Sequence, residues 1–178
     1  MTAPTRHGDW MMTVSGRTFW PLDPRAEEIA IEDIAHSLAH QCRYAGHTRA
    51  FYSVAQHSVL VAQHLPPELQ LWGLLHDASE AYLVDLPRPV KRHLPLYDVA
   101  EDRVMRCVAH RFNLPWPCPP QVKRVDNAIL TDEMRQLMPR LPEGMRTGLG
   151  IVIHPQKPKR ARAEFLSMAN RLLAEVAA

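Results

Sequence analysis

Proline is the residue that most constrains how this chain can fold. Its sixteen prolines stand against seven glycines and cluster at five places along the sequence: 21–24, 66–67, 87–95, 115–120 and 139–142. Proline ends helices and is tolerated in their first turn, so such clusters are typical of the breaks between helices. The distribution therefore predicts a series of helices separated by proline-bearing turns.

The apolar residues between these breaks recur at helical spacing. Residues 31–39 keep an i, i+3, i+4, i+7, i+8 stripe, and Ser53 with Gln56 resembles a capping box that opens a helix over 54–65. Pro66 and Pro67 start a third predicted helix, whose stripe reaches Ala78. Further helices are predicted at about 96–112, about 120–138 and from about 159 to the end.

The front of the chain has a different pattern. β-branched and aromatic residues flank Ser15-Gly16, which predicts a short hairpin. We therefore expect an all-α fold, a compact bundle of about six helices with a short N-terminal β-hairpin. At 178 residues the chain suits one domain, with a hairpin extension at 1–28, a core at 29–138, and a loop and C-terminal helix at 139–178.

Composition excludes several classes of protein. A hydrophobic content of 46% with 22% charged residues is typical of a soluble globular protein. The net charge of +2 is too small to indicate a stable nucleic-acid partner, and the basic run at 157–162 is more typical of a solvated helix. No apolar run approaches the ~20 residues of a membrane span, and the N-terminus lacks a signal-peptide pattern. Three cysteines without CxxC spacing argue against a disulfide framework, so we expect a reducing, cytoplasmic setting.

Charged residues interrupt the apolar segment LLHDASEAYLVDLPRPVK at 74–91. His76, Asp77 and Glu80 are three or four residues apart and can share one patch of a helix. A solvated helix face is one explanation, but a buried carboxylate is costly unless it is paired or coordinates a metal. Adjacent residues point about 100° apart on a helix. His76 and Asp77 can therefore share one ion only at a helix end or at a slight distortion.

Two polar residues elsewhere occupy similar apolar surroundings. His57 lies among Val54, Leu60 and Val61, and Asp126 lies in VKRVDNAIL. Together with the pair at 76–77 they supply two nitrogen and two oxygen ligands, a set that suits Zn²⁺, Mn²⁺, Fe²⁺ or Co²⁺ with open positions for water and substrate. The alternative is a set of unrelated capping or core polar residues. His36 and His40 also have a chelating spacing, but no third ligand is evident, so exposed side chains are expected there.

The order His57, His76-Asp77, Asp126 resembles the H…HD…D signature of the HD-domain metal-dependent phosphohydrolases, which have an all-α scaffold. HDASE followed by DLPRPVK is similar to the active-site segment of bacterial 5′-deoxynucleotidases. YSVAQHSVLVA, with Arg43-Tyr44 upstream, resembles both these enzymes and the small phage dATP triphosphohydrolases. The similarity covers roughly residues 29–138.

The resemblance implies a role for each matching residue. Four residues would hold a divalent metal, with Mg²⁺ as a further candidate: His57, His76, Asp77 and Asp126. Glu80 and Asp85 would activate or position the attacking water and handle the leaving group. Lys91 and Lys123 would face the phosphates.

The remaining matches concern the nucleoside. Arg43 matches the arginine of an Arg-Trp pair, and Tyr44 stands where that tryptophan would be, still offering a stacking face. Pro89 would lie on the opposite side of the nucleoside. The resemblance also implies a homo-oligomer.

The expected function is hydrolysis of a small-molecule (deoxy)nucleotide. Attack on a triphosphate would release nucleoside and triphosphate, whereas attack on a monophosphate would release nucleoside and phosphate. A non-catalytic nucleotide-sensing module and a hydrolase of a signalling nucleotide remain the alternatives.

Overall fold

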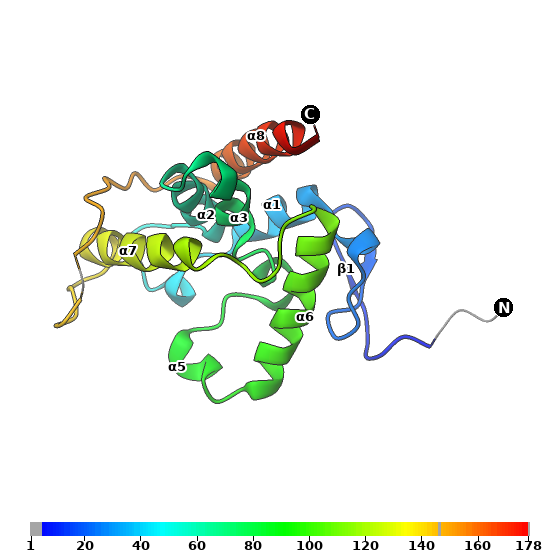
Figure 1. Ribbon diagram of the computed structural model, residues 1–178. Helices are drawn as coiled ribbons and strands as arrows, with labels where there is room; N and C mark the ends of the chain where they lie inside the picture. The colour runs from blue at the N-terminus through cyan, green and yellow to red at the C-terminus, as the bar shows by residue number, and fades with distance from the viewer. Residues whose placement is uncertain (1–4, 146, 178) are drawn as a thin grey trace.

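The prolines do open helices. The structure, a computed structural model, describes residues 5–145 and 147–177 (Figure 1). A proline is the first residue of each of its three longest helices, and the 3-10 turn at Pro67–Leu69 also begins with one.

The helices are α1 (Ile31–His40), α2 (Val54–Gln63), α3 (Gln70–Leu75), α4 (Glu80–Leu83), α5 (Arg88–Lys91), α6 (Pro95–Arg111), α7 (Pro120–Leu137) and α8 (Pro158–Ala177). Six of these described helices have six residues or more, so the predicted all-α fold is confirmed.

The predicted hairpin is also present. Strands β1 (Met11–Met12) and β2 (Thr18–Phe19) pair antiparallel, with Met11 opposite Phe19. Gly16 has a φ of 80° in the connecting turn, a conformation that glycine adopts at little cost. The Phe19 side chain is fully buried and stacks on Tyr82, so the hairpin is joined to the helical core.

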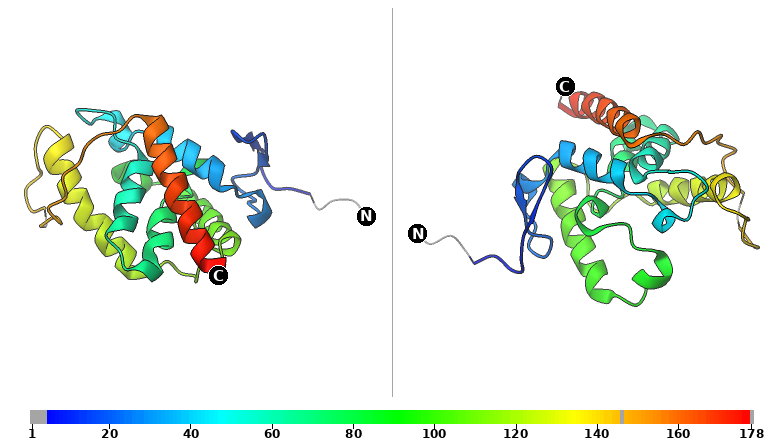
Figure 2. Two further views of the ribbon diagram at one scale, coloured as in Figure 1. Left: turned by 90° about the horizontal axis from the view of Figure 1, so that it is seen from above. Right: turned by 180° about the vertical axis from the view of Figure 1, so that it is seen from behind.

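Helix α2 is central to the core. It contacts α1, α3, α7 and α8, and α8 lies across α1, α2 and α3 (Figure 2). Phe165, Ala169 and Leu172 of α8 are buried in the same apolar cluster as residues of α1, α2 and α3. The C-terminal helix therefore belongs to the core that carries the predicted site.

The N-terminus of α2 differs from the predicted capping box. The Ser53 hydroxyl accepts a hydrogen bond from the Gln56 backbone N–H, as expected. The Gln56 side chain does not return this contact. It donates to the His154 carbonyl and accepts from the Gln156 backbone N–H, because the segment before α8 passes close by. The side chain thus joins α2 to a distant part of the chain.

The predicted third helix is interrupted. Helix α3 ends at Leu75, a turn occupies 76–79, and α4 begins at Glu80. Short i to i−3 bonds span the turn, from the Ala78 N–H to the Leu75 carbonyl and from the Glu80 N–H to the Asp77 carbonyl. The break falls at the His-Asp pair, so the two side chains lie at a helix end.

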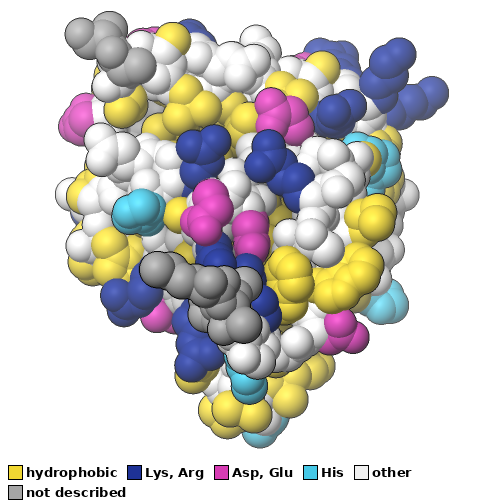
Figure 3. Space-filling model, turned by 90° about the vertical axis from the view of Figure 1, so that its right-hand side faces the viewer, with side chains coloured by type: hydrophobic (Ala, Val, Ile, Leu, Met, Phe, Trp, Pro, Cys, Tyr) yellow, Lys and Arg dark blue, Asp and Glu magenta, His cyan; other side chains and the backbone are white. Residues whose placement is uncertain are grey.

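Surface charge is mixed on the face shown in Figure 3. Lysine and arginine side chains alternate there with aspartate, glutamate and apolar groups. Among the described residues, no helix is both long enough and apolar enough to cross a membrane.

Candidate metal centre and adjoining pockets

Three residues from three helical regions bring ligand atoms together. His57 lies near the start of α2, His76 directly follows α3, and Asp126 lies in the second turn of α7. One ligand atom from each lies within 4.8 Å of the others. His57 and Asp126 are buried, and His57 Nε2 is 3.2 Å from Asp126 Oδ1. This group is able to hold a metal ion.

The hydrogen bonds of the two imidazoles fix which ring nitrogen faces the site. His57 Nδ1 lies 2.6 Å from Glu133 Oε1, and His76 Nδ1 lies 2.8 Å from the Gly73 carbonyl oxygen. Both partners are acceptors, so each Nδ1 carries a proton, and Nε2 is the ring nitrogen that faces the site. Both Nε2 atoms are buried without a hydrogen-bond partner among the described residues. Two such nitrogens beside a carboxylate fit a cation, as expected for metal-binding histidines.

The electrostatics of His57 agree with this geometry. Burial and the Arg43 charge lower the pKa of His57, but the Glu133 and Asp126 carboxylates outweigh them and raise it to about 9. The pKa of Asp126 moves the other way. Burial would raise it, but the hydrogen bond and charges from His57 and His76 lower it well below its usual range. The site thus attracts positive charge.

Asp77 lies at the edge of this group. Its Oδ2 is 3.2 Å from His76 Nε2 and 3.8 Å from His57 Nε2, and Arg43 Nη1 is 3.4 Å away. Burial opposes its ionisation, yet the neighbouring His76 ring lowers the pKa of Asp77 strongly. Because α3 has ended, His76 and Asp77 both face the same point despite being adjacent in sequence. The fourth predicted ligand is therefore beside the other three.

Glu133 was not among the predicted site residues. Its fully buried carboxylate accepts hydrogen bonds from the Tyr44 hydroxyl at 2.6 Å and the Tyr52 hydroxyl at 2.9 Å, besides the contact with His57. Arg43 Nε forms an ion pair with it at 3.3 Å. Burial would raise the pKa of Glu133, but the Arg43 and His57 charges lower it to about 2. A sequence signal existed, since Glu133 follows Asp126 by seven residues and lies on the same helix face.

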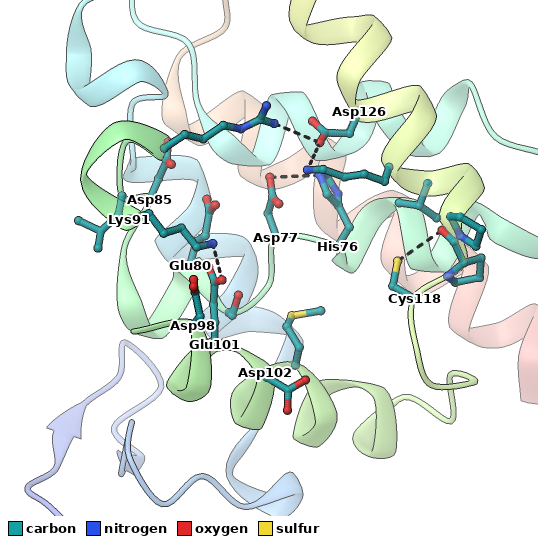
Figure 4. Close-up of a pocket in the computed structure, with 18 of the residues that line it drawn as sticks. His76, Asp77, Glu80, Asp85, Lys91, Asp98, Glu101, Asp102, Cys118 and Asp126 are labelled. Atoms are coloured by element: carbon teal, nitrogen blue, oxygen red, sulfur yellow. Dashed lines mark hydrogen bonds and ion pairs between the residues drawn. The ribbon is translucent and has the colours of Figure 1, made fainter. Parts of the chain in front are cut away.

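A cavity of about 440 Å³ opens beside the metal ligands (Figure 4). His76, Asp77 and Asp126 line one part of it, and Glu80, Asp85 and Lys91 line another. Seven carboxylates and four lysine or arginine side chains line the cavity in all. Counting all seven carboxylates as ionised, these side chains have a formal net charge of −3, which favours a bound cation.

The two predicted catalytic carboxylates, Glu80 and Asp85, line this cavity, and neither forms an ion pair within the described part of the chain. Glu80 Oε2 is buried and accepts no hydrogen bond from the described residues. Burial, then the charges of Asp77 and Asp85, raise the pKa of Glu80 well above its usual range. Burial, only partly offset by Arg43, also raises the pKa of Asp85. Both carboxyl groups therefore hold their protons more tightly than exposed ones do.

The two predicted phosphate-facing lysines line the cavity but have carboxylate partners. Lys91 Nζ pairs with Glu101 of α6, and Lys123 Nζ lies 2.6 Å from Asp126 Oδ2. Arg88, which sequence reasoning did not select, also lines the cavity and lies 3.8 Å from Asp126 Oδ2.

A second pocket of about 600 Å³ adjoins the first. Its lining is largely apolar and includes Leu130, Met134 and Met138, from α7 and the residue that follows it. Both residues predicted to flank a nucleoside, Tyr44 and Pro89, line this pocket. Four residues line both pockets and so form their common wall: Arg43, Asp85, Leu86 and Arg88.

Three further histidines lie outside the metal group. His47 lines the apolar pocket. His36 and His40 stack on each other with ring centroids 4.2 Å apart, and the His40 ring contacts the His36 carbonyl. No metal-ligand group that includes them is found among the described residues.

Comparison with known proteins gives relatives but no activity. No family model matches the chain. Over 128 residues it is 41% identical to the uncharacterized protein YfdR of Escherichia coli, an alignment that covers 72% of each chain. Over 136 residues it is 40% identical to an uncharacterized protein of Rhodobacter capsulatus, covering 71% of this chain and 69% of the relative. The chain therefore belongs to the protein family of Escherichia coli YfdR and its Rhodobacter capsulatus relative.

Proposed function

We propose that this protein is an HD-domain, metal-dependent phosphohydrolase of (deoxy)nucleotides. The observation that carries the proposal is the pair of bare, buried Nε2 atoms on His57 and His76 facing Asp126. This group lies beside a polar cavity, and that cavity shares a wall with an apolar pocket. A nucleotide has the matching two parts, since its phosphates need cations and its base needs an apolar surface.

A divalent ion such as Zn²⁺, Mn²⁺, Co²⁺, Fe²⁺ or Mg²⁺ would be held by His57, His76, Asp126 and Asp77, and would act there as a Lewis acid and acidify water. Glu80 and Asp85 line the same cavity, where in their ionised forms they would accept the proton of the attacking water or orient it. Asp85 also belongs to the wall between the two pockets, where it can act on the bond between phosphate and nucleoside.

The cationic side chains of the cavity would bind the phosphates, and the apolar pocket would bind the nucleoside. Lys91, Lys123, Arg43 and Arg88 line the cavity, each beside a carboxylate, and would exchange these partners for phosphate oxygens when the substrate binds. We propose a polyphosphate rather than a monophosphate because four such groups are present. Tyr44 and Pro89 contact the nucleoside. The resemblance adds a homo-oligomer to this proposal, and the cysteine content adds a cytoplasmic setting.

Product analysis by chromatography tests the function. The purified protein is incubated with deoxynucleoside and ribonucleoside mono- and triphosphates, each with Mn²⁺, Co²⁺, Mg²⁺ or Zn²⁺. We expect nucleoside and triphosphate from a deoxynucleoside triphosphate. Nucleoside and phosphate from monophosphates alone would instead identify a 5′-nucleotidase. An Asp126→Ala protein is the control and should release neither product.

Absence of any product with every metal and nucleotide contradicts a hydrolase. Calorimetric binding of the same nucleotides would then favour the nucleotide-sensing alternative.

A further inference from the structure

The chain between Glu80 and Asp85 has a strained backbone. Val84 ends α4 with φ 69° and ψ 153°, a region that β-branched residues rarely adopt. Its side chain is 52% exposed, so core packing does not hold it there. Backbone strain of this kind persists only where surrounding contacts enforce it. Two side chains from outside this segment supply such contacts.

The first is Gln41, the residue that directly follows α1. Its Nε2 donates to the Glu80 carbonyl at 2.8 Å and to the Ser37 hydroxyl at 3.0 Å, and its Oε1 accepts from the Asp85 backbone N–H at 3.1 Å. Both amide hydrogens and the amide oxygen are thus in use. A single side chain therefore joins the backbones of the two residues that carry the raised carboxyl pKa values.

The second is Tyr97 of α6, on the other side of the segment. Its hydroxyl donates to the Leu83 carbonyl at 3.0 Å and also contacts the Val84 carbonyl. The turn is therefore held between α1 and α6. Glu80, at the start of α4, and Asp85, just past the strained residue, are consequently oriented relative to each other by contacts outside their own segment.

We propose that Gln41 is a positioning residue that sets the Asp85 carboxylate against Glu80 and the cavity. The inference rests on the proposed function, since it matters for catalysis only if these carboxylates act on the attacking water. The side-chain hydrogen bonds of Gln41 go to Ser37, Glu80 and Asp85 rather than to the metal-binding group. Its loss should therefore change the proton-transfer step and leave metal binding intact.

Two variants separate the hydrogen bonds that the Gln41 side chain donates from the one that it accepts. Gln41→Leu removes the donor and the acceptor at similar size, while Gln41→Glu keeps an acceptor for the Asp85 N–H and loses the donors. His40→Leu, an exposed neighbour at the end of α1, is the matched control. For Gln41→Leu we expect kcat to fall by roughly 10- to 100-fold, because an ~1 Å misplacement of a reacting group has effects of that size.

Three readouts distinguish positioning from a general structural role. In Gln41→Leu, the nucleotide KM and the metal affinity should stay within about threefold of wild type, and the acid limb of the kcat–pH profile should move. Gln41→Glu should recover part of kcat. Amide hydrogen exchange at Asp85 should become faster in Gln41→Leu and stay slow in Gln41→Glu.

The outcomes separate the two proposals. A wild-type protein without turnover defeats the proposed function, and hydrogen exchange at Asp85 still decides whether Gln41 holds the turn. Unchanged exchange in Gln41→Leu overturns the inference. So does an unchanged kcat and pH profile in an active protein, or an equal loss in His40→Leu. If Gln41→Leu fails to fold, Gln41→Glu alone must show slow Asp85 exchange with a shifted pH profile.

Discussion

Two buried glutamates close to one centre behave in opposite ways. Glu133 has Arg43, Tyr44, Tyr52 and His57 around its carboxylate, and its pKa is lowered to about 2. Glu80 has a buried oxygen with no hydrogen-bond partner among the described residues, and its pKa is raised. Burial raises the pKa in both cases, so the partners alone decide the outcome.

This difference divides the site into two halves. The half around Glu133 is a closed network that keeps its charges paired and orients His57. The half around Glu80 and Asp85 has raised carboxyl pKa values, and the proposed mechanism assigns proton transfer to it. The proposal therefore gives the first half a structural role and the second a catalytic one. Substitutions in each half test this division.

The largest effect is expected for Asp77→Ala in the metal half. The substitution removes the carboxylate that lies beside both bare ring nitrogens. We expect loss of bound metal and a fall in turnover on the order of 10³-fold or more, because the proposed mechanism depends on a metal ion to activate the attacking water. Elemental analysis and the product assay measure these changes. Asp102→Ala, which changes a cavity carboxylate paired with Arg106, is the control for general charge effects.

Full activity in a metal-free Asp77→Ala protein would disprove the metal-dependent mechanism.

Glu133→Gln should have the next largest effect. The amide cannot neutralise the buried Arg43 and His57 charges, so unfolding free energy should fall by roughly 3 kcal/mol and metal affinity by about 10- to 100-fold. The lowered pKa of Glu133 stabilises the folded protein above pH 4.5, and this contribution disappears as the pH falls toward 2. The stability difference between wild type and variant should shrink over that range, as urea denaturation would measure.

Tyr52→Phe removes one hydrogen bond from the same carboxylate and should give a smaller loss of stability, about 1 kcal/mol. Urea denaturation at neutral pH measures this loss as well. Equal stability of wild type and Glu133→Gln at neutral pH would remove the distinction between the two halves.

Glu80→Gln should have the smallest effect on stability, and with the opposite sign. The pKa of Glu80 is higher in the folded protein than in the unfolded chain. Protonated Glu80 therefore stabilises the folded protein at acidic pH, and this stabilisation is lost as the pH rises through the folded-state pKa. At neutral pH the neutral amide should therefore raise the unfolding free energy by about 1 kcal/mol, while turnover falls. Thermal melts at acidic and neutral pH check this, and metal affinity should stay within about threefold of wild type. A Glu80→Gln protein destabilised at neutral pH would show that this carboxylate is paired.

The sequence by itself determined the longer helices, the hairpin and the group of residues that could hold a metal. Helix positions follow from local apolar periodicity and from proline, whose effects act within a few residues. His57, His76 and Asp126 were identifiable because polar residues within apolar stripes must find partners in the core. The expectation that His76 and Asp77 share a site only at a helix end also agrees with the turn that follows α3.

Only the tertiary structure decided how these residues are held. Glu133 reaches His57 because α7 packs against α2, and Gln41 reaches Glu80 and Asp85 because the end of α1 lies beside α4. The partners of Lys91 and Lys123, and the wall that Arg88 shares between two pockets, likewise depend on which helices meet. Contacts between residues far apart in sequence leave no periodic pattern along the chain. They follow from packing, which also brings Gln41 and Tyr97 to the strained turn at Val84 that precedes Asp85.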